Sequence, residues 1–162
     1  MKVYLDYPTF NQLCLAMAQQ IEQWKPDQLV AVSRGGFSAA HIISKHMNLK
    51  CGVYMPHDGQ MLLPSSYKPI KKLVFVEDLI AKGRTIETLK LFMNKPENST
   101  YEWKIAPVLV DDAFDMSLWM DNILTYGISS PHWMIMPYED FYAMKEGDHG
   151  LFRDGTDKYG KP

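Results

Sequence analysis

The sequence predicts an α/β fold: a single domain built on a parallel sheet flanked by helices. Short, wholly apolar runs alternate along the chain with amphipathic stretches, which is typical of parallel strands covered on both faces by helices. The 162 residues are 46% hydrophobic and 22% charged, enough apolar material for the core of one domain. Since no repeat or interdomain linker interrupts the pattern, we treat residues 1–162 as one domain.

The individual elements follow from the spacing of apolar residues. After Pro8 they recur every three or four positions, which indicates an amphipathic helix that begins near a proline. Residues 57–72 contain Gly59, Pro64 and Pro69 and predict an irregular connection. In chain order we expect a helix over 9–24, a strand over 29–32, a helix over 37–47, strands over 51–55 and from residue 73, a helix over 85–93, and strands over 104–110 and 133–136.

Composition and motifs exclude several functions. The formal net charge of −2 gives no positive field, so we expect neither nucleic acid nor a membrane surface as a partner. P-loop, dinucleotide, nucleophile-elbow and zinc-protease motifs are absent. No apolar run is long enough to cross a bilayer, the first residues lack a secretory apolar region, and Cys14 and Cys51 form no disulfide or metal-ligand pattern. These features predict a cytoplasmic protein.

Two polar loops follow the first and third predicted strands. In an open parallel sheet ligands bind beyond the carboxyl ends of the strands, so both loops lie where a ligand is expected. In the first loop, Gly35 and Gly36 allow backbone N–H groups to approach an anion, and the guanidinium group of Arg34 can donate two parallel hydrogen bonds to it. The second loop opens a helix, whose free N–H groups and dipole favour a phosphate. The loops are Ser33, Arg34, Gly35 and Gly36, and Lys82, Gly83, Arg84 and Thr85.

Two acids, Glu77 and Asp78, stand between these loops. Carboxylates are poor neighbours for phosphate unless they bind hydroxyl groups or a metal ion. A ribose that carries a diphosphate and is held with Mg²⁺ presents hydroxyls, a cation and phosphates in this arrangement. Alone, an acidic pair is often a solvated turn or a helix cap, and a Ser-Arg-Gly-Gly loop is a weak signal. Together on one sheet edge, they favour the ligand site.

The two loops, with the strands before them, resemble a known family. VFVEDLIAKGRT is similar to the phosphoribosyl diphosphate signature of the type I phosphoribosyltransferases, and LVAVSRGG resembles their pyrophosphate loop, above all in the guanine, xanthine and hypoxanthine enzymes. The similarity runs from the first helix to about Asp140. It implies a type I phosphoribosyltransferase fold with a small C-terminal hood and tail over 111–162, and a mobile lid over 56–72 in which Ser66 and Tyr67 lie.

The resemblance also implies roles for these residues. Glu77 and Asp78 would hold the ribose hydroxyls directly or through Mg²⁺, the expected cofactor, and together with Arg34 would be catalytic. Arg153 resembles an arginine that contacts pyrophosphate. Homodimers or homotetramers are usual in the family. The full diphosphate-binding set would be Ser33, Arg34, Gly35, Gly36, Glu77, Asp78, Ala81, Lys82, Gly83, Arg84 and Thr85.

The resemblance places the base near the C-terminal end of the similarity. Trp133 would stack on the purine, although a large apolar residue here also suits a core. The backbone of Met136, Pro137 and Tyr138 would reach the base edge, and Asp111 would meet the exocyclic group.

Three positions depart from the 6-oxopurine enzymes. Those enzymes carry an aspartate at the position of Ala81 and a lysine at that of Asp111. An aspartate accepts hydrogen bonds and suits a base with an amino group. Another alignment gives the lysine role to Lys104, but we prefer Asp111, because Lys104 begins its strand and would lie at the edge of the sheet opposite the ligand loops. Lys82 replaces a threonine and either supplies a charge to the 5-phosphate or is solvated surface.

The predicted function is Mg²⁺-dependent transfer of the phosphoribosyl group from phosphoribosyl diphosphate to a nucleobase, expected to be a purine, with release of pyrophosphate. The main alternative is a non-catalytic regulator of the same fold that binds the diphosphate or a nucleotide, which Ala81 and the short lid favour. A third possibility is transfer to another acceptor or hydrolysis of the diphosphate.

Overall fold

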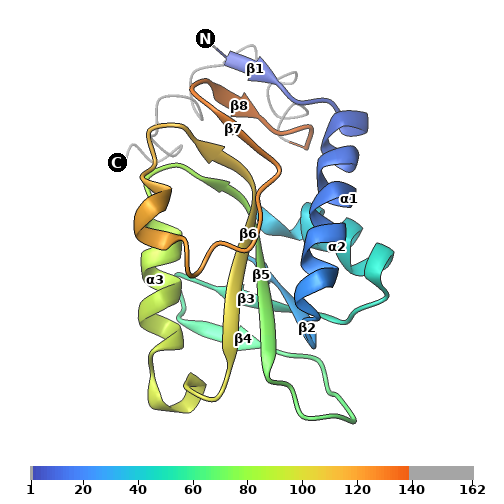
Figure 1. Cartoon of the computed structure of the whole chain (residues 1–162), viewed down its shortest axis with the longest axis vertical. Coiled ribbons are helices and arrows are strands. Elements are labelled where there is room, and N and C mark those ends of the chain that lie inside the picture. The colour runs from blue at the N-terminus through green and yellow to red at the C-terminus, as the bar shows by residue number, and fades with distance from the viewer. Residues whose placement is uncertain (1, 139–162) are drawn as a thin grey trace.

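The computed structural model describes residues 2–138 and is built on a six-stranded sheet (Figure 1). Its strand order is β4-β3-β2-β5-β6-β7, with all neighbours parallel except β4, which runs antiparallel to β3. The predicted parallel α/β fold is therefore confirmed. The strands are β2 (Gln28–Val32), β3 (Cys51–Met55), β4 (Gln60–Leu62), β5 (Lys72–Ile80), β6 (Glu102–Asp111) and β7 (Ile128–Ser130).

Helices cover both faces of this sheet. The α1 (Tyr7–Trp24) and α2 (Gly36–Met47) helices pack on one face, and α3 (Arg84–Met93) packs on the other (Figure 1). In β5 the side chains alternate: Val74 and Val76 face the first pair of helices, while Phe75 faces α3. Two short 3₁₀ turns, η1 (Pro96–Asn98) and η2 (Met116–Trp119), complete the connections.

Local signals set the ends of the first helix. The Asp6 carboxylate accepts a hydrogen bond from the Thr9 N–H at 2.8 Å, which caps the helix. Hydrogen bonding from the Thr9 side chain, and then from this N–H, lowers the pKa of Asp6. Pro8 lies in the first turn, where its missing N–H costs nothing. The helix stops at Lys25, whose φ of 54° places it in the left-handed region. No helix in residues 2–138 is both long and apolar enough to span a membrane.

A second, two-stranded sheet stands over the carboxyl ends of β5 and β6 (Figure 1). It pairs β1 (Lys2–Tyr4) with β8 (Trp133–Ile135) in parallel. From here on, the hood means β1, β8 and residues 136–138. It differs from the hood and tail predicted over 111–162, because it includes β1 and leaves out residues 111–132. The strand predicted over 133–136 is present as β8, but it pairs with β1 outside the main sheet, because β7 occupies the edge beside β6. Being three residues long and largely exposed, β7 carries no apolar pattern that predicts a strand.

The connection 57–72 was predicted as irregular, but its first part forms β4. The turn 56–59 joins the carboxyl end of β3 to β4, which then runs back along the sheet. The rest of the connection is held at the amino-terminal ends of the strands, since the Pro64 carbonyl accepts from Gln28 Nε2 at 3.0 Å and the Asp27 carboxylate accepts from the backbone N–H groups of Lys71 and Lys72. Of the lid predicted over 56–72, only the turn lies at the carboxyl ends, and lid motion stays a prediction.

Candidate functional site

The loop after β2 packs directly on β5. The Ser33 N–H donates to the Tyr54 carbonyl at 2.8 Å, the Ser33–Arg34 peptide is cis, and α2 begins at Gly36. A Cβ added to Gly35 would lie 2.0 Å from Asp78 Oδ2, and one added to Gly36 would lie 2.1 Å from the Val76 carbonyl oxygen. Both glycines are therefore needed for this close approach, in addition to the anion contacts that the sequence predicts for them. Arg34 is exposed.

The acidic pair ends β5 beside this loop. Glu77 is 5% exposed, whereas Asp78 is half-buried. Burial raises the pKa of Glu77 well above its usual value and the charge of Asp78 raises it further, while a hydrogen bond from the Thr85 side chain opposes the shift. The Leu79 N–H donates to Asp78 Oδ1 at 2.8 Å. Asp78 is therefore the acid better placed to meet a ligand, and Glu77 lies behind it.

The second predicted loop brings the start of α3 to the same place. Gly83 has a φ of +76° and precedes the helix, and a Cβ there would lie 2.7 Å from the Phe114 ring. Lys82 and Arg84 are exposed, and Thr85 is half-buried next to Glu77. The first turn of α3, with its free N–H groups, therefore begins beside Glu77, and the exposed Lys82 and Arg84 flank Gly83 at the start of this turn.

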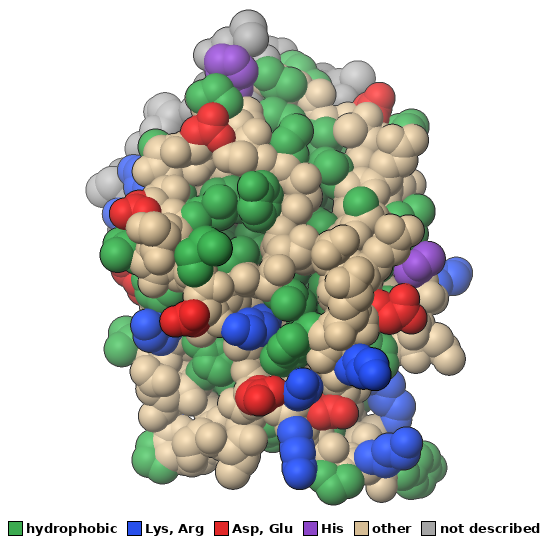
Figure 2. Space-filling view, in the orientation of Figure 1, with side chains coloured by type: hydrophobic (Ala, Val, Ile, Leu, Met, Phe, Trp, Pro, Cys, Tyr) green, Lys and Arg blue, Asp and Glu red, His purple; other side chains and the backbone are tan. Residues whose placement is uncertain are grey.

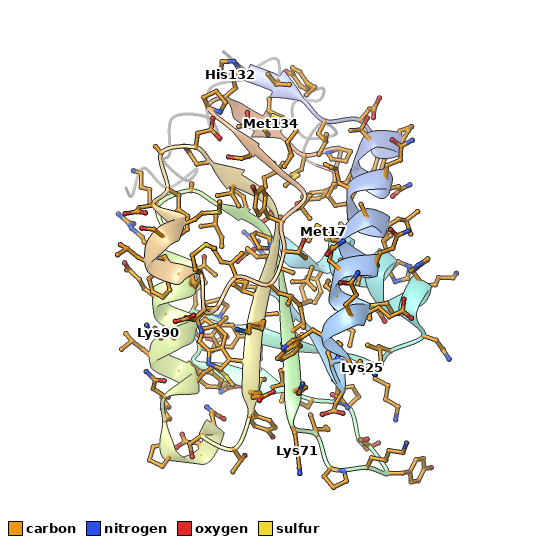
Figure 3. The ribbon with its side chains drawn as sticks, viewed as in Figure 1. Met17, Lys25, Lys71, Lys90, His132 and Met134 are labelled. Carbon is orange, nitrogen blue, oxygen red and sulfur yellow. The ribbon has the colours of Figure 1, made fainter. Side chains whose placement is uncertain are left out.

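A narrow cavity of about 10 Å³, room for about one water molecule, lies between the ends of β5 and β6 and the hood, so a base would enter it only if the cavity widened. Figure 3 shows two of its residues, His132 and Met134, at the end of the sheet opposite Lys25 and Lys71. On the face shown in Figure 2, charged side chains gather toward the end of the molecule where Lys25 and Lys71 lie. The lining residues are Leu79, Ala81, Leu109, Val110, Asp111, Ser130, His132 and Met134.

The cavity distinguishes the two candidates for the exocyclic group of a base. Asp111 lines it, with Oδ1 accepting from the Ala113 N–H at 2.8 Å. Lys104 lies near the amino-terminal end of β6, and its ammonium group donates to the Asp121 carbonyl. Lys104 therefore lies at the end of β6 away from the two loops, as the sequence predicts, and the contact of Asp111 with a base stays a prediction.

The hood reaches the acidic pair through a residue whose side chain we did not predict to act there. Met136 and Pro137 are buried, and Tyr138, expected to contribute backbone at the base edge, donates its hydroxyl to Asp78 Oδ2 at 2.8 Å. No local pattern signals this contact, since 60 residues separate the partners. The backbone of Trp133 lies in β8, and its stacking on a base stays a prediction. Arg153 lies outside the described residues.

The acidic pair could bind a magnesium ion that is shared with the substrate, but it lacks the third protein ligand that a metal site built from protein alone requires. Residues 2–138 contain no cluster of three or more His, Cys, Asp or Glu side chains able to hold a metal. Two adjacent carboxylates offer hard oxygen donors, and Mg²⁺ is commonly bound by one or two carboxylates together with substrate phosphates and water. A larger cavity of about 560 Å³ lies between α2 and β3–β4. It is lined mainly by apolar residues, so we do not place the phosphate site there.

The arrangement of sheet, hood and loops is the type I phosphoribosyltransferase fold. The structure is similar to the xanthine-guanine-hypoxanthine phosphoribosyltransferase of Helicobacter pylori, with a TM-score of 0.67 and 20% identity, over 90% of this chain and 99% of that one. It is also similar to the purine phosphoribosyltransferase of Pyrococcus horikoshii, with a TM-score of 0.65 and 22% identity, over 85% of this chain and 93% of that one.

In sequence, the chain is similar to part of a curated protein. A stretch of 42 residues is 40% identical to the hypoxanthine-guanine phosphoribosyltransferase of Saccharomyces cerevisiae. The match spans 26% of this chain and 19% of the yeast protein. No family model matches the sequence. These comparisons confirm the predicted fold and the resemblance to purine phosphoribosyltransferases.

Proposed function

We propose that the protein transfers the phosphoribosyl group of phosphoribosyl diphosphate to a nucleobase and releases pyrophosphate. The observation that carries this proposal is the placement of the acidic pair between the two glycine-containing loops: the Asp78 carboxylate touches the first loop at Gly35, and Glu77 behind it contacts Thr85 of the second loop. A substrate with vicinal hydroxyls between two phosphate-bearing ends matches this order of groups. The purine enzymes among the similar proteins support the same chemistry.

Each part of the site has a role in this proposal. The amides of the 33–36 loop and Arg34 meet the pyrophosphate, and the start of α3 with Thr85 meets the 5-phosphate. Asp78 accepts from the ribose hydroxyls. Asp78, with Glu77 behind it, would hold Mg²⁺, which would neutralise charge on the diphosphate.

In the reaction, a nitrogen of the base forms a bond to the anomeric carbon while the bond from that carbon to the diphosphate oxygen breaks. The purine loses one proton as the new bond forms. Because Ala81 offers no acceptor, a group other than residue 81 must take that proton. Catalysis then rests mainly on positioning and on charge stabilisation by the loops.

The base in this proposal carries an amino group rather than a carbonyl oxygen at its exocyclic position. Asp111 lines the cavity, and a carboxylate accepts from an amino group but repels a carbonyl oxygen. Ala81 lines the same cavity and adds no polar group. Adenine, which carries an amino group at C6, meets this requirement, whereas hypoxanthine, guanine and xanthine carry a carbonyl oxygen at that carbon and do not.

A base panel tests the reaction and the choice of base together. Pyrophosphate release is measured with phosphoribosyl diphosphate, Mg²⁺ and adenine, hypoxanthine, guanine or xanthine in turn. We expect turnover with adenine at least tenfold above the oxo bases, and Asp111→Lys should reverse the order by placing a donor at the cavity. Asp112→Lys, at the exposed neighbouring acid, is the matched control and should leave the order unchanged. Preference for an oxo base in the unaltered protein would contradict the assignment of Asp111.

A second variant tests the diphosphate site. Asp78→Asn should weaken Mg²⁺-dependent binding of phosphoribosyl diphosphate, measured by calorimetry, at least tenfold, while Asp121→Asn at an exposed acid should not change it. Unchanged affinity in Asp78→Asn would show that the substrate binds elsewhere.

The non-catalytic regulator remains the second candidate, favoured by the alanine at position 81, which cannot exchange a proton with a base. It predicts tight binding of the diphosphate without turnover of any base in the panel. Pyrophosphate release without an added base would instead indicate hydrolysis.

A further inference from the structure

Three segments that are far apart in the sequence meet at one carboxylate. The Asp78 side chain lies against Gly35 of the loop after β2, accepts from the backbone at the end of β5, and accepts from Tyr138 of the hood. Both of its oxygens have a hydrogen-bond donor, each at 2.8 Å. The position of this carboxylate is thus set jointly by the main sheet and the hood.

The Tyr138 hydroxyl lies at the joint between these segments. Besides Asp78 Oδ2 at 2.8 Å, it lies 3.3 Å from the Gly35 carbonyl oxygen. A phenol has one proton to donate, and the shorter contact to a carboxylate is the stronger of the two. The hydroxyl therefore acts chiefly on Asp78, with the Gly35 carbonyl as a secondary acceptor.

The Tyr138 ring is held by a contact that does not involve its hydroxyl group. It packs edge-on against Phe10 of α1, with ring centroids 6.0 Å apart and an interplanar angle of 79°. Phe10 is fully buried, so the ring rests on the rigid core rather than on the surface. Removing only the hydroxyl would leave this packing in place, which separates the effect of the hydrogen bond from the effect of the fold.

We propose that Tyr138 is a positioning residue for the diphosphate substrate: its hydroxyl fixes the Asp78 carboxylate in the orientation that receives the ribose hydroxyls. An aspartate carboxyl rotates over a broad range unless it is hydrogen-bonded, and here the backbone holds one oxygen while Tyr138 holds the other. This inference rests on the proposed function. It deepens that function by making the diphosphate site depend on the hood, the segment that we expect to carry the base.

The test compares Tyr138→Phe with Tyr4→Phe. Tyr4 belongs to the same hood and is 53% exposed, so its variant removes a hydroxyl without touching the acids. We expect Tyr138→Phe to weaken the binding of phosphoribosyl diphosphate with Mg²⁺ about tenfold, the usual scale for a hydrogen bond to a charged group, with Tm almost unchanged. In turnover, KM for the diphosphate should rise while KM for the base stays constant. The control should match the unaltered protein.

The outcomes separate this inference from the proposed function. Equal diphosphate affinity in Tyr138→Phe and in the unaltered protein overturns the positioning role and leaves the proposed function standing. A parallel loss of diphosphate affinity, base affinity and Tm also overturns it, because that pattern indicates a purely structural role. If the unaltered protein binds no phosphoribosyl diphosphate, the proposed function fails. In that case amide exchange still tests the contact, because the Leu79 N–H should exchange faster in Tyr138→Phe than in Tyr4→Phe.

Discussion

Replacing Gly36 with alanine tests how closely the loop after β2 must approach β5. The added Cβ would lie 2.1 Å from the Val76 carbonyl oxygen, and real Cβ atoms essentially never come within 3.0 Å of such an atom. Val76 cannot withdraw easily, because its strand is paired on both sides, with Ala31 of β2 and Ala106 of β6. The loop itself must therefore move, by roughly 1 Å, to restore an ordinary contact.

The size of the effect follows from two opposing terms. Overpacking a tight interior contact costs about 1–3 kcal/mol, and alanine returns up to about 1 kcal/mol over glycine in a helix, here at the first residue of α2. We expect a net loss of about 1–2 kcal/mol. For a chain of this length that lowers Tm by roughly 2–8 °C.

Gly35→Ala is the informative partner of this variant. Its Cβ would meet the Asp78 carboxyl group at 2.0–2.3 Å, and a side chain, unlike the backbone of β5, can rotate away. That rotation gives up the hydrogen bonds from Leu79 and Tyr138. We expect a smaller loss of stability than for Gly36→Ala but a loss of diphosphate affinity of at least tenfold.

Thermal unfolding and diphosphate calorimetry on the two variants check both statements. Gly59→Ala is the control for the cost of backbone strain without a steric clash. Its Cβ would meet nothing within 4 Å, and only its φ of +58° opposes the change. If Gly36→Ala is as stable as the unaltered protein, the loop does not pack on β5 as described. If Gly35→Ala keeps full diphosphate affinity, the position of the Asp78 carboxylate does not control the site.

Three further predictions follow from burial. Because the pKa of Glu77 is raised in the folded state, the folded protein keeps the Glu77 carboxyl protonated to higher pH than the unfolded chain does. The free energy of unfolding should therefore fall as pH rises above about 4.5. Glu77→Gln should remove this contribution to the pH dependence, measured by denaturant titration without metal. Burial raises the pKa of Cys14 to about 12, so at pH 8 a thiol reagent should modify Cys14 slowly until the protein unfolds. Rapid labelling of Cys14 in the native protein would contradict its burial. Phe75→Ala, in the core beneath α3, should cost about 3–5 kcal/mol in denaturant unfolding, and a loss below 1 kcal/mol would refute its core placement.

The sequence predicted the larger elements to within a few residues. The helix expected over 9–24 is Tyr7–Trp24, and the strand expected over 51–55 is Cys51–Met55. Long amphipathic periods and continuous apolar runs carry this information locally. The three-residue strands β1, β4 and β7 lack it, because they become strands only by pairing with a partner that is distant in sequence or with an edge that the rest of the fold provides.

The sequence by itself determined which residues make up the candidate site: an acidic pair between two loops suited to anions, with Ala81 and Asp111 where the enzymes that it resembles have other residues. Each loop is contiguous, so its residue types can be read without a structure. Only the tertiary structure decided how these parts meet. It packs Gly35 on Asp78, places Asp111 rather than Lys104 at the cavity, and brings the Tyr138 hydroxyl to the acids, since these contacts depend on strand order and on the docking of the hood.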